Sequence, residues 1–224
     1  MSKMKIKLRR AELKCDEIRN GEVALFNEWR FPGFISDGVV NPEEYCKSNL
    51  RILIVLKEVN GGKDWDLRDF LRNSGGRNQT WGPVARWIKG IRNLPDEYDW
   101  ESIETVSDQD RIDWLKDIAA INVKKLAGGA VADSKKIRNF LYSENNREYL
   151  KRQVNLYKPD LVILGNTGSD WYLSSVDWKV TKRGIKYCQE DNGTIVVSYS
   201  HPGARVGAQF LYYGLMDALR EIMY

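Results

Sequence analysis

Four short apolar runs, rich in β-branched residues, constrain the fold of this 224-residue chain more than any other feature. They cover residues 51–57, 118–123, 160–165 and 194–200. Each run is almost continuously apolar, which is typical of strands that are covered on both faces, as in a parallel sheet. Helical segments between the runs would supply the two covering layers. We therefore expect a three-layer α/β/α fold around a central, mainly parallel four-stranded sheet.

Segments with a helical spacing of apolar residues lie between and after these runs. The stretches WGPVARWIKGI (81–91) and REYLKRQVNLYKP (147–159) each place apolar side chains on one face, and so does the C-terminal stretch 208–224. A further helix is expected around EVALFNEWRF (22–31). These segments alternate with the apolar runs, as an α/β fold requires.

The stretches outside these elements predict turns and loops. Residues 180–188 are typical of a small hairpin with its turn at Arg183 and Gly184, inserted before the last core strand. Two polar, Gly-rich stretches, 60–66 and 73–82, are expected to be loops. Neither fits GxxxxGK[ST] or GxGxxG, so these nucleotide-binding loops are not supported.

The composition is that of an ordinary globular protein. No repeat or linker divides residues 1–224, so we expect one domain with a helical N-terminal extension over about residues 1–48. The longest apolar run is too short to span a bilayer, and we expect no membrane partner. Three cysteines without metal-binding spacing favour reduced thiols in the cytoplasm. A net charge of +4 permits a polyanionic partner without requiring one.

Polar side chains follow each of the four predicted strands. Ligands of an open α/β sheet bind beyond the carboxyl ends of its strands. We expect one carboxylate, Glu58, one amide, Asn122, and the only histidine of the chain, His201, to share that edge. Each of these residues is also common in ordinary turns and loops, so their coincidence is only modest support for a site.

The motifs at these strand ends, taken in order, resemble those of the uracil-DNA glycosylase superfamily. VLKEVNG (55–61) stands in place of that family's first motif, INVKKLAGG (121–129) is similar to its NVVKCRPP motif, and SYSHPGAR (198–205) is similar to its TYHPSAL motif. YLKRQVNLYKPDLVILGNTG (149–168) is similar to LLEQLELIRPKVILALGATA of thermophile-type members. The resemblance covers roughly residues 50–205. It implies a monofunctional DNA glycosylase that hydrolyses the N-glycosidic bond of a flipped-out pyrimidine and leaves an abasic site.

The chain departs from this family in two respects. Its first motif lacks the family's proline and has Glu58 where GQDPY-type members have aspartate. Iron–sulfur branches hold their cluster with four cysteines, whereas this chain has three, with different spacing. The resemblance is therefore to a divergent branch without a cluster, and we expect no cofactor and no metal.

The resemblance implies roles for the residues near the base. Glu58 would stabilise positive charge on the sugar and orient a water molecule, and His201 would stabilise the departing base as a neutral donor. Asn122 would read the Watson–Crick edge of the base. Asn60 and Trp81 are further candidates for base contacts, with core packing the favoured interpretation of Trp81.

Other residues are expected to face DNA, the partner we expect for a monomeric protein. Arg205 is a candidate wedge for the gap that a flipped base leaves, with an ordinary phosphate contact or a solvated side chain as the alternative. Lys124 and Lys125 are candidates for phosphate contacts, with a solvated pair at least as well supported. Ser200, next to the histidine, is also a DNA-binding candidate.

The residues after the first motif bear on which base is removed. Asn60, Gly61 and Gly62 stand where the strict uracil branch has a bulky tyrosine, so we expect a pocket that admits a C5-modified cytosine. Such bases occur in phage DNA, which makes phage defence a hypothesis beside repair of uracil or mismatched thymine. Two further classes stay open: a non-catalytic nucleic-acid-binding protein on the same fold, and a hydrolase of free nucleosides.

Overall fold

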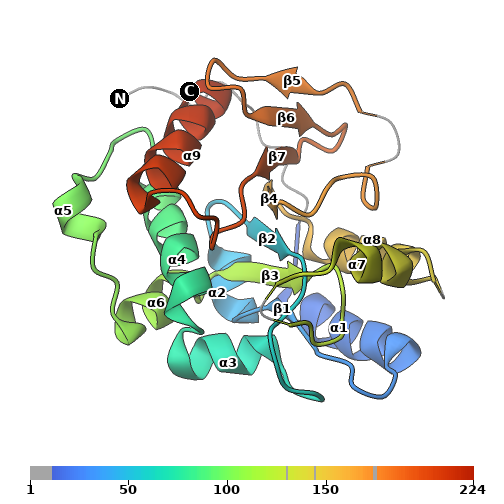
Figure 1. The fold of residues 1–224 in the computed structure, drawn as a ribbon. Coiled ribbons are helices and arrows are strands. Elements are labelled where there is room, and N and C mark those ends of the chain that lie inside the picture. The colour runs from blue at the N-terminus through green and yellow to red at the C-terminus, as the bar shows by residue number, and fades with distance from the viewer. Residues whose placement is uncertain (1–11, 130, 144, 174–175) are drawn as a thin grey trace.

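The computed structural model describes residues 12–129, 131–143, 145–173 and 176–224, which form an α/β fold (Figure 1). Its described helices are α1 (Cys15–Trp29), α2 (Pro42–Lys47), α3 (Leu67–Ser74), α4 (Asn78–Asn93), α5 (Trp100–Ile103), α6 (Asp108–Leu115), α7 (Ser134–Leu141), α8 (Asn146–Tyr157) and α9 (Ala208–Met223). Its described strands are β1 (Gly38–Val39), β2 (Ile52–Leu56), β3 (Ile118–Asn122), β4 (Leu161–Gly165), β5 (Lys179–Val180), β6 (Lys186–Gln189) and β7 (Ile195–Tyr199). None of the helices in these ranges is both long and apolar enough to cross a membrane.

The four strands predicted from the apolar runs lie side by side and run parallel. The order β1-β3-β2-β4-β7-β6-β5 places them at the centre of the sheet. Leu56 pairs with Asn122 at the end of β2 and β3, and Gly165 pairs with Tyr199 at the end of β4 and β7. The carboxyl ends of these strands therefore meet along one edge, as the sequence predicted.

The sheet is larger than predicted, because within the described residues it has seven strands and is mixed. β1 pairs antiparallel with β3, β6 pairs antiparallel with β7, and β5 pairs with β6. β1 spans only two residues, too few for a period-2 pattern, and gave no signal in the sequence. The hairpin was predicted, but as an insertion, whereas β6 extends the sheet and β5 forms its exposed edge. The expectation of a four-stranded sheet was wrong.

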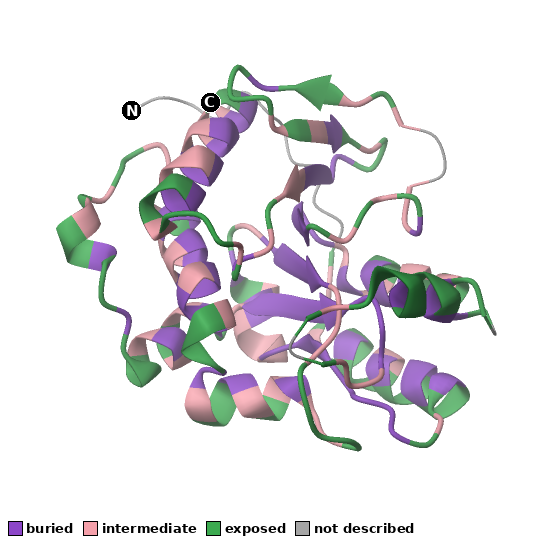
Figure 2. Ribbon diagram, in the orientation of Figure 1, coloured by how far each residue is buried: buried purple, intermediate pink, exposed green. Residues whose placement is uncertain are grey.

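Two helical layers cover the sheet, and alternate residues of β2 divide between them. Ile52, Ile54 and Leu56 pack with side chains of α3, α4, α6 and α9 in one cluster. Leu53 and Val55 pack with side chains of α1, α2, α7 and α8 in a second cluster. All five side chains are buried (Figure 2), which explains why the run is continuously apolar.

The described part of the N-terminal segment is integrated into this fold. Ile18 and Phe26 of α1 belong to the same apolar cluster as the sheet, and β1 adds a strand beside β3. The helix predicted around residues 22–31 begins earlier, at Cys15. Residues 1–11 of the predicted extension lie outside the described residues.

Helices also occupy part of the Gly-rich stretches that were predicted as loops. α3 follows the first stretch, and α4 begins at Asn78, inside the second, three residues before the predicted start at Trp81. Gly75 and Gly76 between them have φ angles of +65° and +73°. Since such angles favour glycine, these two residues allow the sharp turn that directs α4 across the sheet.

Candidate functional site

A cleft of about 600 Å³ lies at the carboxyl ends of the central strands. It is lined by residues from β2 and the following loop, the start of α4, the end of β3 and the loop after β7. Six sequence-predicted site residues line it: Glu58, Asn60, Trp81, Asn122, His201 and Arg205. Lys124 and Ser200 do not belong to its lining.

Asn122, the last residue of β3, lines this cleft and has an unsatisfied buried polar group. The residue is 3% exposed, and its Nδ2 atom has no hydrogen-bond partner among the described residues. Its backbone N–H donates to Oδ2 of Asp37 at 2.7 Å, which fixes the strand end. Leaving a buried amide unpaired costs about 1–3 kcal/mol, so this atom is suited to an acceptor on a bound ligand.

His201 is held in the loop after β7 with a defined tautomer. The backbone N–H of Gly203 donates to Nδ1 at 3.0 Å, so Nδ1 acts as an acceptor. Burial lowers the pKa of the imidazole, and the charge of Lys57 lowers it further. The ring is therefore neutral at pH 7, with its proton on Nε2 as a donor.

Glu58, two residues beyond β2, is buried and paired. Its side chain is 5% exposed, and Oε2 lies 2.5 Å from Nζ of Lys124. Gly128 packs directly against this carboxylate, because a Cβ atom added there would overlap both carboxylate oxygens. The carboxylate is thus confined between a cation and a flat stretch of backbone at the wall of the cleft.

The two lysines after β3 are buried, which contradicts the expectation of a solvated pair. Lys124 is 7% exposed and bonds Glu58 and the carbonyl of Ala127. Lys125 is 0% exposed, and its Nζ lies 2.5 Å from Oδ1 of Asp37. Neither lysine is a solvated surface group available for phosphate, because both side chains turn inward to carboxylates that are distant in sequence.

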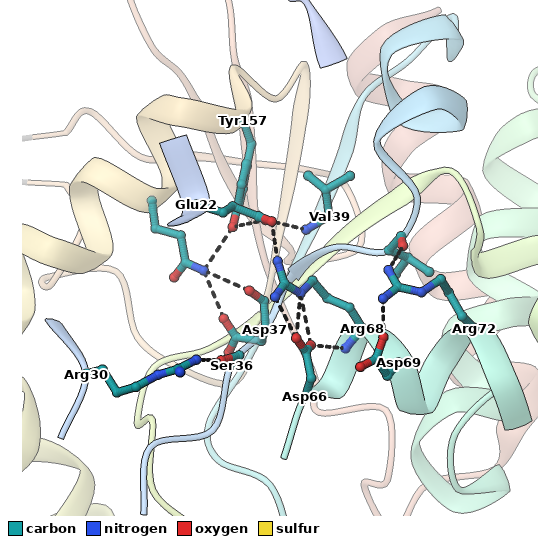
Figure 3. A network of polar contacts seen from close by, with 12 residues as sticks. Glu22, Arg30, Ser36, Asp37, Val39, Asp66, Arg68, Asp69, Arg72 and Tyr157 are labelled. Atoms are coloured by element: carbon teal, nitrogen blue, oxygen red, sulfur yellow. Dashed lines mark hydrogen bonds and ion pairs between the residues drawn. The ribbon is translucent and has the colours of Figure 1, made fainter. Parts of the chain in front are cut away.

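Asp37 connects the site to a wider polar network between the sheet and its helices (Figure 3). Gln153 of α8 donates to Oδ1 of Asp37 at 2.9 Å and to the Tyr157 hydroxyl at 3.0 Å. Tyr157 in turn donates to Glu22 at 2.8 Å, and Arg68 of α3 pairs with the same carboxylate. Burial raises the pKa of Glu22 and lowers that of Lys125. The network ties α1, α3 and α8 to the backbone of Asn122.

The rim and walls of the cleft combine positive charge with aromatic surface. Among the described residues that line it, Glu58 is the only acidic one, whereas Lys57, Arg77 and Arg205 are basic. Three aromatic side chains also line it: Trp65, Phe70 and Trp81. Sequence reasoning missed Arg77 and Trp65, since isolated residues in polar loops carry no periodic signal. It also missed Phe70, which lies in α3, a helix that was not predicted.

Trp81 takes part in both the core and the cleft. It is 5% exposed, belongs to the apolar cluster under α4, and lies close against Gly76 and Leu71. The small residues 60–62, which were expected to widen the pocket, are exposed, but the side chain of Trp65 packs against Gly61 and Gly62. A Cβ at Gly62 would lie 2.6 Å from the indole Nε1 of Trp65, and that Nε1 donates to Gly61 at 3.1 Å.

The loop around His201 has several exposed residues, although Pro202 is buried. Ser200 and Arg205 are exposed, as the prediction of DNA contacts requires, although Ser200 lies outside the lining of the cleft. Val206 and Phe210 are apolar but 51% and 75% exposed. Sequence reasoning did not single out these two residues, which lie outside the buried apolar stripe of Leu211, Leu215 and Leu219 on α9.

No model of a known protein family matches this chain, and no curated protein matches it. Within the described ranges, no group of three or more His, Cys, Asp or Glu side chains could hold a metal ion.

Proposed function

We propose that this protein is a monofunctional DNA glycosylase that hydrolyses the N-glycosidic bond of a pyrimidine turned out of the DNA stack. The observation that carries the proposal is the unpartnered amide of Asn122, in the same cleft as the Glu58 carboxylate and the neutral imidazole of His201. A flipped base offers acceptors to such an amide. The basic residues on the cleft wall suit the phosphates that flank it.

The carboxylate and the imidazole suit the two ends of the bond that breaks. As the bond between C1′ and the base nitrogen lengthens, positive charge develops on the sugar and negative charge on the base. Glu58 stabilises the sugar and orients the water whose oxygen bonds to C1′, and the proton that this water loses passes to the carboxylate and then to solvent. The Nε2–H of His201 donates to the base, which leaves with the bonding electrons and takes its proton from solvent.

The volume and the aromatic walls of the cleft support a proposal for the substrate range. Its volume of about 600 Å³ exceeds the need of an unmodified pyrimidine, and its aromatic walls suit a planar ring. We therefore propose a C5-modified cytosine, as in phage DNA, ahead of uracil. This substrate makes the protein a candidate for phage defence.

Abasic-site formation on a panel of DNAs tests the proposal. Purified protein is incubated with DNA containing uracil, a thymine mismatch, hydroxymethylcytosine or glucosylated hydroxymethylcytosine, and with free nucleosides. We expect abasic sites in the modified DNA, lost in His201→Ala and Glu58→Gln. Release from uracil alone would overturn the choice of base. Release only from free nucleosides would make the protein a nucleoside hydrolase.

A second candidate is a nucleic-acid-binding protein on the same fold that lacks catalysis. The ion pair between Glu58 and Lys124 favours it, because the carboxylate has a partner without any substrate. This candidate predicts salt-dependent DNA affinity and no base release from any member of the panel.

A further inference from the structure

Lys124 forms an ion pair with Glu58 and lies outside the lining of the cleft. Beyond the β2–β3 pair of Leu56 and Asn122, the backbone N–H of Lys124 still donates to the carbonyl of Lys57 at 2.9 Å. This continued pairing brings Lys124 and Glu58 onto adjacent strand ends. The register of the sheet therefore brings Nζ of Lys124 within 2.5 Å of Oε2 of Glu58.

The contacts of Lys124 inside the protein indicate its function. Its Nζ is occupied by Glu58 and, at 3.2 Å, by the carbonyl of Ala127, and its side chain is 9% exposed. An ammonium group with both contacts inside the protein does not reach a phosphate on the surface. It fixes the carboxylate in one place.

We infer that Lys124 is a positioning residue for Glu58 that holds the carboxylate in the geometry needed for base release. The inference rests on the proposed function. It replaces the phosphate contact that the sequence suggested for Lys124. The opposite wall, formed by Gly128, completes the confinement of the carboxylate.

Lys124→Met tests this role through the separate effects on kcat and KM. Methionine fills a similar volume without a charge, so we expect kcat to fall by about 10- to 100-fold with KM little changed. Lys124→Arg, which retains a cation that can hold the carboxylate, is expected to recover part of the lost rate. An unchanged kcat in Lys124→Met would overturn the inference.

A double-mutant cycle separates positioning from DNA contact. If Lys124 acts through Glu58, then Lys124→Met has no further effect on the residual rate in a Glu58→Gln background. Loss of DNA affinity in both backgrounds, with a salt dependence reduced by about one phosphate contact, would overturn the inference. The double variant also removes both buried charges, which protects against unfolding caused by one unpaired charge.

The position of the carboxylate in the free protein distinguishes failure of this inference from failure of the proposed function. Crystal structures of the protein with and without Lys124→Met are compared. A Glu58 carboxylate that has moved away from Gly128 in the variant supports the role of Lys124 even if no DNA is cleaved. An unmoved carboxylate together with an unchanged kcat of an active enzyme would refute the inference.

Discussion

The backbone N–H of Gly203 donates a hydrogen bond of 3.0 Å to Nδ1 of His201. This bond requires an unprotonated Nδ1, so protonation of the ring would break it. Burial and the charge of Lys57 act in the same direction, because both lower the pKa of the imidazole. One loop thereby supplies a neutral histidine whose Nε2–H is the donor.

The first prediction concerns the charge of this histidine. His201 is the only histidine in the chain, so its NMR signals need no assignment. We expect its titration midpoint below 6.5, the ordinary pKa of a histidine, with ¹⁵N shifts of the Nε2–H tautomer. The unfolded chain binds this proton more readily, so His201 lowers stability as the pH falls from about 6.5 through the lowered pKa.

Base release should follow the same titration. As far as His201 controls it, the rate of base release is expected to be constant above pH 6.5 and to decrease below the midpoint measured by NMR. His201→Ala should lower kcat by about 100- to 1,000-fold, whereas His201→Gln, which retains an N–H donor, should lose less. A midpoint above 6.5 would contradict the neutral imidazole.

A second prediction uses two adjacent glycines as a matched pair. Gly128→Ala places a methyl group into the Glu58 carboxylate, whereas a Cβ at Gly129 meets nothing closer than the Val131 carbonyl at 3.9 Å. Neither glycine has a positive φ angle, so alanine fits both backbones. We expect Gly128→Ala to lower kcat by about 100-fold, because it displaces the carboxylate, and Gly129→Ala to retain most of the activity. Equal rates for the two variants would show that the position of the carboxylate does not matter.

A third prediction concerns the buried pair of Asp37 and Lys125. Asp37→Asn leaves a fully buried ammonium group without its counter-charge, so we expect a loss of about 3–5 kcal/mol in the free energy of unfolding. Asp37→Asn combined with Lys125→Met removes both charges, and its Asn oxygen can still accept from the backbone of Asn122. Urea unfolding should show that the double variant recovers most of the lost stability. A double variant less stable than Asp37→Asn would contradict this account.

The strands and the strand-end residues could be predicted because both depend on local sequence. A run such as ILIVL is apolar whichever helices cover it, and the residues after each run must lie at one edge of a parallel sheet. Glu58, Asn122 and His201 were placed in one cleft by this reasoning alone. Their family and their chemistry remain predictions.

The partners of these residues could not be predicted, because they come from distant segments. Asp37 lies 85 residues before Asn122, and nothing in its own neighbourhood indicates a bond to that backbone. Lys124 and Lys125 look like ordinary surface lysines, since their burial depends on carboxylates contributed by Asp37, just before β1, and by the loop after β2. Long-range pairing of charges leaves no periodic pattern in either segment.

The last prediction assigns different tasks to two exposed residues after His201. Arg205 lines the cleft beside other cations, so we expect it to contact phosphate. Arg205→Ala should weaken binding to duplex and single-stranded DNA alike and reduce the salt dependence by about one contact.

Phe210 is 75% exposed at the start of α9, and an apolar ring there suits the space that a flipped base leaves in a duplex. Phe210→Ala should therefore slow release from duplex DNA more than from single strands, because only the duplex must be unstacked. Val23→Ala, at an exposed position of α1 outside the cleft, is the control for loss of surface apolar area. A duplex-specific defect in Arg205→Ala and none in Phe210→Ala would reverse the assignment.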